Sequence, residues 1–272
     1  MKAQTNVEPT IQELFDLSGR SVLVTGASGW LGSSMSRGLA EAGATVVVTS
    51  RNAQQAAEFA AALPGQGHVG LGFSQDDTDS IPGFIADIVE RMGAIDVLVN
   101  SAYGGKSPNI DEATAENFDR SYHTGVTAYF LLAREVAHHL RQRKSPGSII
   151  NIGSMYGIVA SYPDAYEGLG INSPPNYHGL KGGIVHLTRH LATYWAKHNI
   201  RVNAICPGAF PPTRVSDAPF GSEFLGRLVK KVPLGRMGQP SELKGLVVLL
   251  ASDAGSYLTG QNILVDGGWT CW

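Results

Sequence analysis

The sequence predicts one α/β domain built on a doubly wound parallel sheet of seven strands, with helices on both faces. Seven short runs of β-branched and apolar residues recur along the chain, and most are almost continuously apolar, as strands buried on both faces must be. Helical patterns separate these runs, and such alternation favours βαβ units. Charged residues make up only 16% of the 272, which favours one large domain with much buried surface.

The strands are predicted, in chain order, at 21–25, 45–50, 68–73, 95–100, 147–153, 200–206 and 262–267. Apolar residues at helical spacing place the main helices at 30–43, 53–63, 81–93, 115–143 and 177–195. Residues 1–16 are interpreted as an N-terminal extension, and residues 17–272 as a single catalytic domain.

Two stretches, 157–176 and 207–224, are too polar or too rich in proline and glycine to continue this pattern. They follow the fifth and sixth predicted strands, so both project from the carboxyl edge of the sheet, where open α/β folds bind their ligands. We therefore expect them to form the lid of a substrate site.

Charge and composition argue against several classes of partner. The net charge of −2 gives no electrostatic footprint for nucleic acid or an anionic membrane. No run approaches the roughly 20 apolar residues of a membrane span, and the first residues lack the apolar core of a signal peptide. Cys206 and Cys271 are interpreted as packed or inert thiols in a reducing compartment. We expect a cytoplasmic protein that acts on a small molecule and has no metal site.

The stretch TGASGWLG, residues 25–32, follows the first strand and is typical of a phosphate cradle. Such a turn must reverse tightly, approach a pyrophosphate closely and expose amide N–H groups at a helix N-terminus. Gly26 is expected to make the turn, Gly29 to allow the close approach, and Gly32 to let the helix pack on the sheet. Trp30 can point away from the phosphates. The predicted cofactor contacts in this loop are Gly26, Ser28, Gly29, Trp30, Leu31 and Gly32.

The end of the second strand, TSRN, bears on the choice of nucleotide. Folds that bind NAD place a carboxylate about 20 residues after the loop, whereas folds that bind NADP use an arginine there. Ser50 stands where the carboxylate would be, and Arg51 follows with a guanidinium that can hold a 2′-phosphate. We predict NADP as the cofactor, with NAD as the alternative, and contacts from Ser50, Arg51 and Asn52.

The stretch YHGLK opens the helix after the fifth strand and places Tyr177 and Lys181 on one helical face. A free phenol has a pKa of about 10, and a neighbouring ammonium group lowers that pKa by favouring the phenolate. Tyr177 is then suited to exchange a proton with an alcohol or a carbonyl. Ser154, in the stretch NIGS on the preceding strand, completes a predicted catalytic set.

These motifs and their order, with DDTD, NSA, RVNAICPG and LVDGG elsewhere, resemble the short-chain dehydrogenase/reductase family over more than nine-tenths of the chain. The resemblance implies a Rossmann-like fold and hydride transfer between NAD(P) and a secondary alcohol or ketone. It implies that Tyr177 is the catalytic acid/base, that Ser154 hydrogen-bonds the substrate oxygen, and that Lys181 holds the nicotinamide ribose. It also implies cofactor contacts from Asp76, Asp77, Asn100, Ala102, Pro207, Gly208 and Thr213.

Four features depart from the family pattern. The glycine spacing is that of a longer branch, which processes nucleotide sugars. Tyr103 stands where a glycine is usual. Tyr122, beside His123, stands where an asparagine normally anchors a proton-relay water, so we assign no catalytic role there. The 23-residue step from Ser154 to Tyr177 is longer than the family's usual spacing.

The longer segment carries tyrosine, acidic and amide side chains that suit a polyhydroxylated substrate, because buried polar groups discriminate strongly against apolar analogues. This region and the C-terminal VDGGWTCW are similar to those of gluconate-5-dehydrogenase-like sugar and polyol oxidoreductases. We therefore expect a sugar, sugar acid or polyol as substrate. The candidate substrate contacts are Tyr103, Tyr162, Tyr166 and Arg214.

Three other functions remain open from the sequence: a non-catalytic NADP sensor, an epimerase or dehydratase of nucleotide-linked sugars, and a reductase of acyl thioesters or steroids. The exact substrate, the direction and the stereochemistry also stay open. The apolar stripe along 177–195 favours a homo-oligomer, a dimer or tetramer, because the family counterpart of this helix pairs with itself. The alternative is that the stripe only covers the sheet of its own chain.

Overall fold

The computed structural model describes residues 8–103, 108–212 and 221–272. Within these ranges seven strands form one sheet, every neighbouring pair is parallel, and the order is β3-β2-β1-β4-β5-β6-β7. Each lies where the sequence predicts a strand, so the predicted fold class is confirmed. The bounds are β1 Ser21–Val24, β2 Thr45–Ser50, β3 Val69–Gly72, β4 Val97–Asn100, β5 Gly147–Ile152, β6 Ile200–Pro207 and β7 Asn262–Val265.

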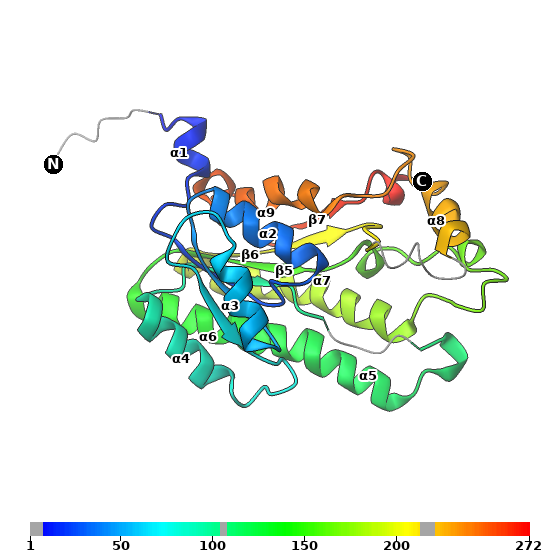
Figure 1. Cartoon of the computed structure of the whole chain (residues 1–272), viewed down its shortest axis with the longest axis horizontal. Helices are drawn as coiled ribbons and strands as arrows, with labels where there is room; N and C mark the ends of the chain where they lie inside the picture. Colours follow the sequence, from blue (N-terminus) through cyan, green and yellow to red (C-terminus); the bar gives the residue numbers. More distant parts are fainter. Residues whose placement is uncertain (1–7, 104–107, 213–220) are drawn as a thin grey trace.

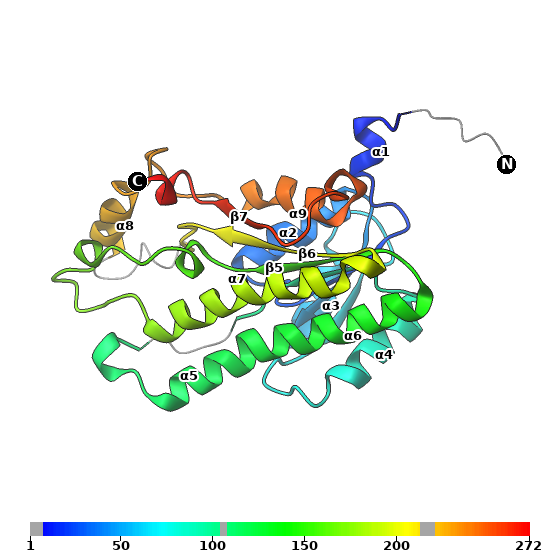
Figure 2. The same cartoon turned by 180° about the vertical axis from the view of Figure 1, so that it is seen from behind.

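Helices cover both faces of the sheet (Figures 1 and 2). Helices α2, α3 and α9 pack on one face, and α4, α6 and α7 pack on the other. Helix α5 leads into α6, while α1 and α8 lie at opposite ends of the molecule (Figure 1). The bounds are α1 Ile11–Phe15, α2 Trp30–Glu41, α3 Ala53–Ala61, α4 Ile81–Met92, α5 Ala115–Tyr122, α6 Ala128–Arg143, α7 Pro175–Trp195, α8 Gly221–Val229 and α9 Lys244–Ala251.

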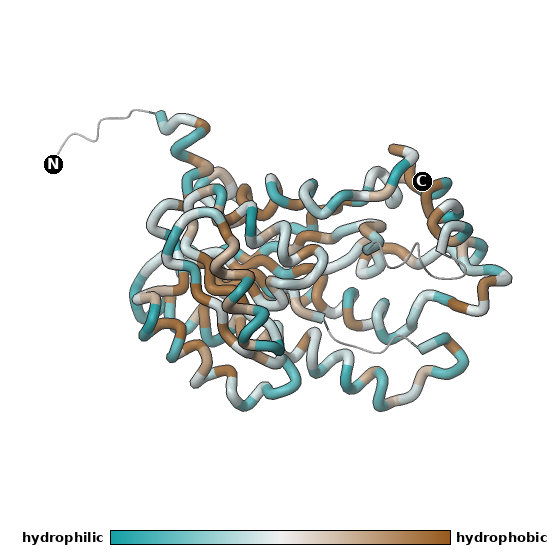
Figure 3. The backbone as a smooth tube through the Cα atoms, viewed as in Figure 1, coloured by the Kyte–Doolittle hydropathy of each residue, from teal (hydrophilic) through white to brown (hydrophobic). Residues whose placement is uncertain are grey.

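Two hydrophobic cores sandwich the sheet, and the alternation of side chains along each strand feeds both of them. In β1, Val22 and Val24 belong to the core under α2 and α9, whereas Leu23 belongs to the core under α4 and α6. All three are fully buried. Hydrophobic segments accordingly gather where the strands cross the middle of the molecule (Figure 3). This double burial explains why the strand sequences are apolar throughout.

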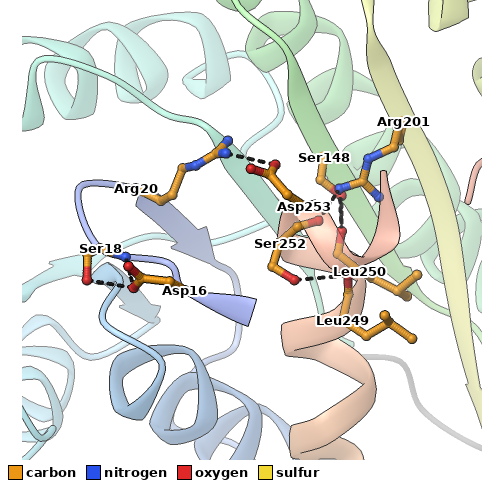
Figure 4. Close-up of polar contacts among 9 residues, drawn as sticks. All are labelled: Asp16, Ser18, Arg20, Ser148, Arg201, Leu249, Leu250, Ser252 and Asp253. Carbon is orange, nitrogen blue, oxygen red and sulfur yellow. Dashed lines mark hydrogen bonds and ion pairs between the residues drawn. The ribbon is translucent and has the colours of Figure 1, made fainter. Parts of the chain in front are cut away.

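Polar contacts close the amino-terminal edge of the sheet (Figure 4). The Arg201 guanidinium, at the start of β6, donates to the carbonyl oxygens of Leu250 at 2.8 Å and Ser252 at 3.1 Å. The Ser148 hydroxyl donates to the same Leu250 oxygen at 2.7 Å. These carbonyls end helix α9 and have no partners within the helix, so the partly buried Arg201 guanidinium is well placed to satisfy them. The arrangement fixes α9 on the sheet at the edge away from the ligand-binding loops.

The helix predicted over 115–143 is interrupted by a π-helical turn at His123–Thr127. Gly125 lies against α7 there, because a Cβ on it would stand 2.9 Å from Leu180 Cδ1. Single π-helical turns of this kind are frequent at functional sites. The sequence periodicity carried no signal for the extra residue, since the apolar face continues through it.

The predicted lid loop 157–176 and the described start of the second loop, 207–212, follow the carboxyl ends of β5 and β6. Loop 157–176 contains a short 3₁₀ turn, Pro163–Ala165, and leads into α7. Loop 207–224 is described at 207–212 and from Gly221 onward. Arg227 of α8, which follows the second loop, donates to the carbonyl oxygens of Asp164 and Glu167 and so ties α8 to the first loop. Among the described helices, none is long and apolar enough to cross a bilayer.

The close approach of β3 to α3 generates a stability prediction. A Cβ on Gly70 would lie 2.2 Å from the backbone carbon of Ala56, whereas a Cβ on Gly83 in α4 would meet nothing within 4 Å. We expect Gly70→Ala to lower the free energy of unfolding by about 1–3 kcal/mol, as overpacking does. The matched change Gly83→Ala should leave it unchanged or raise it by up to about 1 kcal/mol. Urea unfolding checks both values, and equal stabilities of the two variants would contradict the packing argument.

Candidate active site

A cleft of about 760 Å³ opens at the carboxyl ends of the strands, around β1, where the chain switches direction across the sheet. Most of the predicted site residues converge on it from segments far apart in the sequence. Those that line it are Gly26, Ser28, Gly29, Trp30, Leu31, Gly32, Ser50, Arg51, Asp76, Ala102, Tyr103, Tyr177, Lys181, Pro207 and Gly208.

The glycine loop lines the cleft, and the packing at Gly26 and Gly32 leaves no room for a side chain at either position. Gly26 has φ +63°, and a Cβ on it would lie 2.7 Å from Ala102 Cα. A Cβ on Gly32 would lie 2.3 Å from the Gly26 carbonyl oxygen. Thr25 fixes the turn from below, because its Oγ1 accepts the backbone N–H groups of Ser101 at 3.0 Å and Ala102 at 3.3 Å. The N-terminus of α2, capped at Gly29, therefore meets the cleft with its amide groups free for an anion.

Trp30 turns its side chain across the cleft. Its indole Nε1 donates to the Phe210 carbonyl oxygen at 3.0 Å, and the residue keeps 42% of its surface exposed. Both residues line the cleft, so this bond joins the glycine loop to the segment after β6. The ring thus finds a partner without displacing the backbone cradle.

The far end of the cleft carries the groups expected to select a nucleotide. Arg51 is exposed there, and the Ser50 hydroxyl donates to Gln55 Oε1 at 3.1 Å. Asn52 does not line the cleft; its side chain caps α3 by accepting the Gln55 backbone N–H. Among the described residues, the one carboxylate that lines the cleft is Asp76. Room for a 2′-phosphate beside Arg51, and the bare glycine cradle, fit the predicted NADP.

Asp76 and Asp77 are engaged with other protein groups. The Asp76 carboxylate lies 3.7 Å from the Arg120 guanidinium and accepts the Ser74 hydroxyl at 3.3 Å. Asp77 faces a separate hollow beside α4, where it accepts the Ser80 N–H. Their predicted cofactor contacts stay predictions.

Tyr177 and Lys181 lie at the other end of the cleft, and Ser154, which does not itself line the cleft, lies within hydrogen-bond reach of Tyr177. Tyr177 and Lys181 line the cleft from the first turns of α7. Lys181 is only 4% exposed; its Nζ donates to the Ile152 carbonyl oxygen at 2.7 Å and lies 5.6 Å from the centre of the Tyr177 ring. Ser154, beyond β5, is 5% exposed and its Oγ accepts the Tyr156 N–H at 3.1 Å. The three predicted catalytic residues are thus neighbours in space.

Burial dominates the proton equilibria of this group in the free protein. It raises the pKa of Tyr177 to about 12, although the Ser154 side chain acts in the opposite direction. It lowers the pKa of Lys181 to about 8, because an ammonium group is costly to enclose. The sequence predicts that the neighbouring ammonium group lowers the pKa of Tyr177. In the free protein that pKa is raised instead, because both groups are enclosed by protein, and local spacing carries no signal for enclosure.

A buried amide network holds α7 on the sheet behind the cleft. Asn100 is fully buried, and its Nδ2 donates to the Tyr129 carbonyl oxygen at 3.2 Å and to Asn151 Oδ1 at 3.0 Å. Asn151 in turn donates to the Thr188 hydroxyl of α7 at 3.0 Å. Strands β4 and β5 are thereby locked to the helix that carries Tyr177. This is where the structure places Asn100, which the resemblance assigned to the cofactor.

Tyr103 and Tyr122, which depart from the family pattern, and His123, the neighbour of Tyr122, lie in different places. Tyr103 lines the cleft and stands edge-on to Tyr177, with ring centres 5.4 Å apart. Tyr122 instead covers the bare surface of α7 at Gly179, 3.4 Å from where a Cβ would stand. His123 Nε2 is bonded to the Asp76 backbone oxygen at 3.0 Å. From this π-helical segment it is Thr124 that lines the cleft.

The lid beside Tyr177 is held by aromatic side chains. Tyr156 stacks on His178 at 4.6 Å, and its hydroxyl lies 3.3 Å from that of Tyr166. Tyr162 points elsewhere: its hydroxyl donates to the Trp272 carbonyl oxygen at 3.2 Å. Trp269, 1% exposed, packs between these rings and joins the C-terminus to the lid. Thr213 and Arg214 lie outside the described residues.

Several residues on the cleft were missed by sequence reasoning. The most informative are Gln55, Ser74, Gln75, Thr124 and Phe210. Gln75 and Ser74 directly precede the predicted Asp76, so position after a strand was a usable signal for them. Nothing in the local sequence marked the other three.

Comparisons with known proteins agree with this geometry. The family model described as enoyl-(acyl carrier protein) reductase matches residues 26–270. The chain is 34% identical to gluconate 5-dehydrogenase of Gluconobacter oxydans, over 95% of this chain and 97% of the relative. It is 33% identical to the solved structure of a short-chain type dehydrogenase/reductase from Mycobacterium marinum, with a TM-score of 0.84 and coverage of 97% and 100%.

A third similar protein was solved with ligands. The gluconate 5-dehydrogenase of Burkholderia cenocepacia, in complex with NADP and tartrate, is 30% identical, has a TM-score of 0.85, and is covered over 97% of this chain and 100% of that one. The matches span nearly the whole of each chain, and the cleft is lined by Tyr177 and Lys181 beside a glycine-rich turn, with Ser154 next to Tyr177. The chain belongs to the short-chain dehydrogenase/reductase family.

Proposed function

We propose that this chain is an NADP-dependent oxidoreductase that interconverts a secondary alcohol and a ketone on a sugar, sugar acid or polyol. The observation that carries the proposal is a single cleft with Tyr177 and Lys181 at one end and Arg51 at the other. That spacing matches a dinucleotide laid across the glycine loop, with its reactive ring beside the phenol. When bound, NADPH supplies the hydride for reduction of the ketone, and NADP⁺ accepts it in the reverse reaction.

The protein residues handle the oxygen and its proton. In reduction, the Tyr177 phenol gives its proton to the substrate oxygen while the Ser154 hydroxyl donates a hydrogen bond to the same atom. In oxidation, Tyr177 takes that proton back. Lys181, nearly buried beside the Tyr177 ring, stabilises the phenolate by its charge and holds the ribose hydroxyls. Enclosure of both groups keeps water from competing for the proton.

Arg51 and the glycine loop support the choice of NADP. Ser50 stands where an NAD-binding fold would place a carboxylate, and the exposed guanidinium of Arg51 follows it on the cleft. The similar Burkholderia cenocepacia enzyme was solved with NADP. NADP binding therefore uses the phosphate-binding N-terminus of α2 and the charge of Arg51 together.

The class of substrate is supported by the lid and by the relatives. Hydroxyl and imidazole groups of Tyr156, Tyr166, Ser173 and His178 gather next to Tyr177. Groups of this kind hydrogen-bond a chain of hydroxyls. The similar proteins named above are gluconate 5-dehydrogenases, and one of them holds tartrate, a small hydroxy acid.

A homo-oligomer is the assembly we propose, and a cytoplasmic location stays a prediction. Gly182, His186, His190 and Tyr194 follow one another at every fourth position along the outer face of α7. A Cβ on Gly182 would meet nothing within 4 Å, and Tyr194 is 63% exposed. Bare backbone at Gly182, on the same helix face as the exposed Tyr194 ring, suits close contact with the same helix of a second chain.

The first prediction concerns the phenol. Tyr177→Phe removes the group that transfers the proton, so turnover should fall by a factor of about 100 or more, while NADPH binding is kept. The measurement is absorbance at 340 nm with a panel of sugar acids, polyols and apolar alcohols, with NADPH affinity measured separately. Turnover of an apolar alcohol alone would contradict the substrate class. Undiminished turnover by the variant would contradict the mechanism.

The pH dependence of kcat should follow Tyr177. Oxidation needs the phenolate, so its rate should fall as the pH drops below the pKa of Tyr177 in the loaded enzyme. Reduction needs the phenol, so its rate should fall above that pKa. Lys181→Met removes a stabilising positive charge and should move the oxidation profile to higher pH, whereas Lys181→Arg should hold it near the wild-type position. Superimposable profiles of the wild type and Lys181→Met would contradict the role of the ammonium group.

The assembly proposal is tested by molar mass in solution. The wild type should elute as a dimer or tetramer in size exclusion with light scattering. Tyr194→Arg places charges on the proposed face and should shift the mass towards the monomer. Tyr257→Arg, the same change at a fully exposed tyrosine elsewhere, should not. A wild-type protein with the mass of one chain at micromolar concentration would refute the proposal.

A further inference from the structure

Gln75 is a buried polar side chain on the cleft that has no role in the proposed mechanism. It lies in the segment after β3, lines the cleft and is only 8% exposed. Its Nε2 is enclosed and has no hydrogen-bond partner in the described ranges of the chain. Burying an amide donor without a partner costs free energy, so native proteins rarely keep one unless a ligand or water completes it.

The flanking residues are already committed to protein contacts. The Ser74 hydroxyl and the Asp76 backbone and carboxylate bond to each other, and Asp76 also pairs with Arg120. The Asp76 carbonyl oxygen holds His123. These bonds fix the backbone on both sides of Gln75. Gln75 is therefore held in place in the wall of the cleft, and its Nε2 is the side-chain donor in this segment for which the described residues supply no hydrogen-bond partner.

The strand order decides which part of a dinucleotide lies beside it. Gln75 follows β3, the edge strand next to β2, whereas Tyr177 stands beyond β5, on the other side of the switch at β1. Arg51 lines the cleft at the end of β2, and β2 lies between β3, which Gln75 follows, and β1, which the glycine loop follows. Because the nicotinamide must reach Tyr177 and the 2′-phosphate must reach Arg51, the base next to that phosphate falls at Gln75.

A glutamine amide offers one acceptor and a donor side by side. This pair matches the N6/N7 edge of adenine, where the 6-amino group donates and the ring nitrogen N7 accepts. We propose that Gln75 hydrogen-bonds the adenine edge and makes the enzyme select adenine over bases without the 6-amino group. The proposal rests on the proposed function, since it assumes that a dinucleotide occupies the cleft. The residue that contacts the base is then Gln75 and not its neighbour Asp76, which the family resemblance implied as a cofactor contact.

Hypoxanthine is the discriminating probe. Its 6-oxo group replaces the amino donor with an acceptor, so that O6 and N7 both accept and the amide can pair with only one of them in either orientation. The full-length protein should bind NADPH at least about tenfold more tightly than the hypoxanthine analogue of NADPH, which is the size of effect expected from one paired amide contact. Dissociation constants come from titration of nicotinamide fluorescence, without a substrate or turnover.

Two variants and two controls isolate the amide. Gln75→Met, similar in length, and Gln75→Leu should bind both dinucleotides with Kd values within about twofold of each other, and unfolding should show both variants folded because no protein bond is lost. Gln54→Met, the same change at an exposed glutamine that bonds Glu58, should keep the wild-type ratio. Arg51→Ala should weaken NADPH relative to NADH and yet keep the preference for adenine over hypoxanthine.

The outcomes separate this inference from the proposed function. Equal wild-type affinities for the two bases, or an unchanged ratio in both Gln75 variants, would overturn the role of Gln75 while NADPH binding and Tyr177-dependent turnover still support the enzyme. Absence of binding by either dinucleotide would overturn both. A ratio lost in the Gln75 variants and kept in Gln54→Met and Arg51→Ala supports the assignment.

Discussion

The turn after β1 is the constraint on which the rest of the site depends. Gly26, in the left-handed region, lies against Ala102, and Gly32 lies against Gly26, at distances that no Cβ can share. The Thr25 hydroxyl bonds the two N–H groups that follow β4, so the ends of the two central strands form one rigid floor. This packing brings the amide end of α2 onto the switch point of the sheet. A cofactor can then lie across the strands with its ends on opposite sides of β1.

Enclosure sets the chemistry at one end of that floor. Lys181 and Tyr177 are held by α7, and the amide network from Asn100 through Asn151 to Thr188 fixes α7 on the strands. Burial raises the pKa of Tyr177 to about 12 and lowers that of Lys181 to about 8 in the free protein. Both shifts disfavour charge. At neutral pH the Tyr177 phenol is therefore protonated, whereas the Lys181 ammonium group still keeps its proton. The phenolate forms when a bound ligand changes the surroundings of the pair, which links proton transfer to an occupied site.

At the other end, two polar side chains are proposed to select the nucleotide. Arg51 is exposed on the cleft, and the enclosed Nε2 of Gln75 has no hydrogen-bond partner among the residues that the structure describes. Trp30 behaves differently, because its indole is bonded to the segment after β6 and leaves the cradle to the backbone. The tryptophan in the glycine loop thus joins two walls of the cleft.

The sequence by itself determined the seven strands, the parallel sheet, the glycine cradle and the Ser154–Tyr177–Lys181 set. Strand periodicity and fixed motif spacing are local properties, so residues close in the chain are enough to reveal them. Only the tertiary structure decided that Asn100 serves a buried network, that Tyr122 covers α7, and that Asp76 is paired with Arg120 while Gln75 is not. These facts depend on which distant segments meet. A hydrogen bond or a burial cost belongs to the pair of groups and their surroundings, and one-dimensional spacing does not contain it.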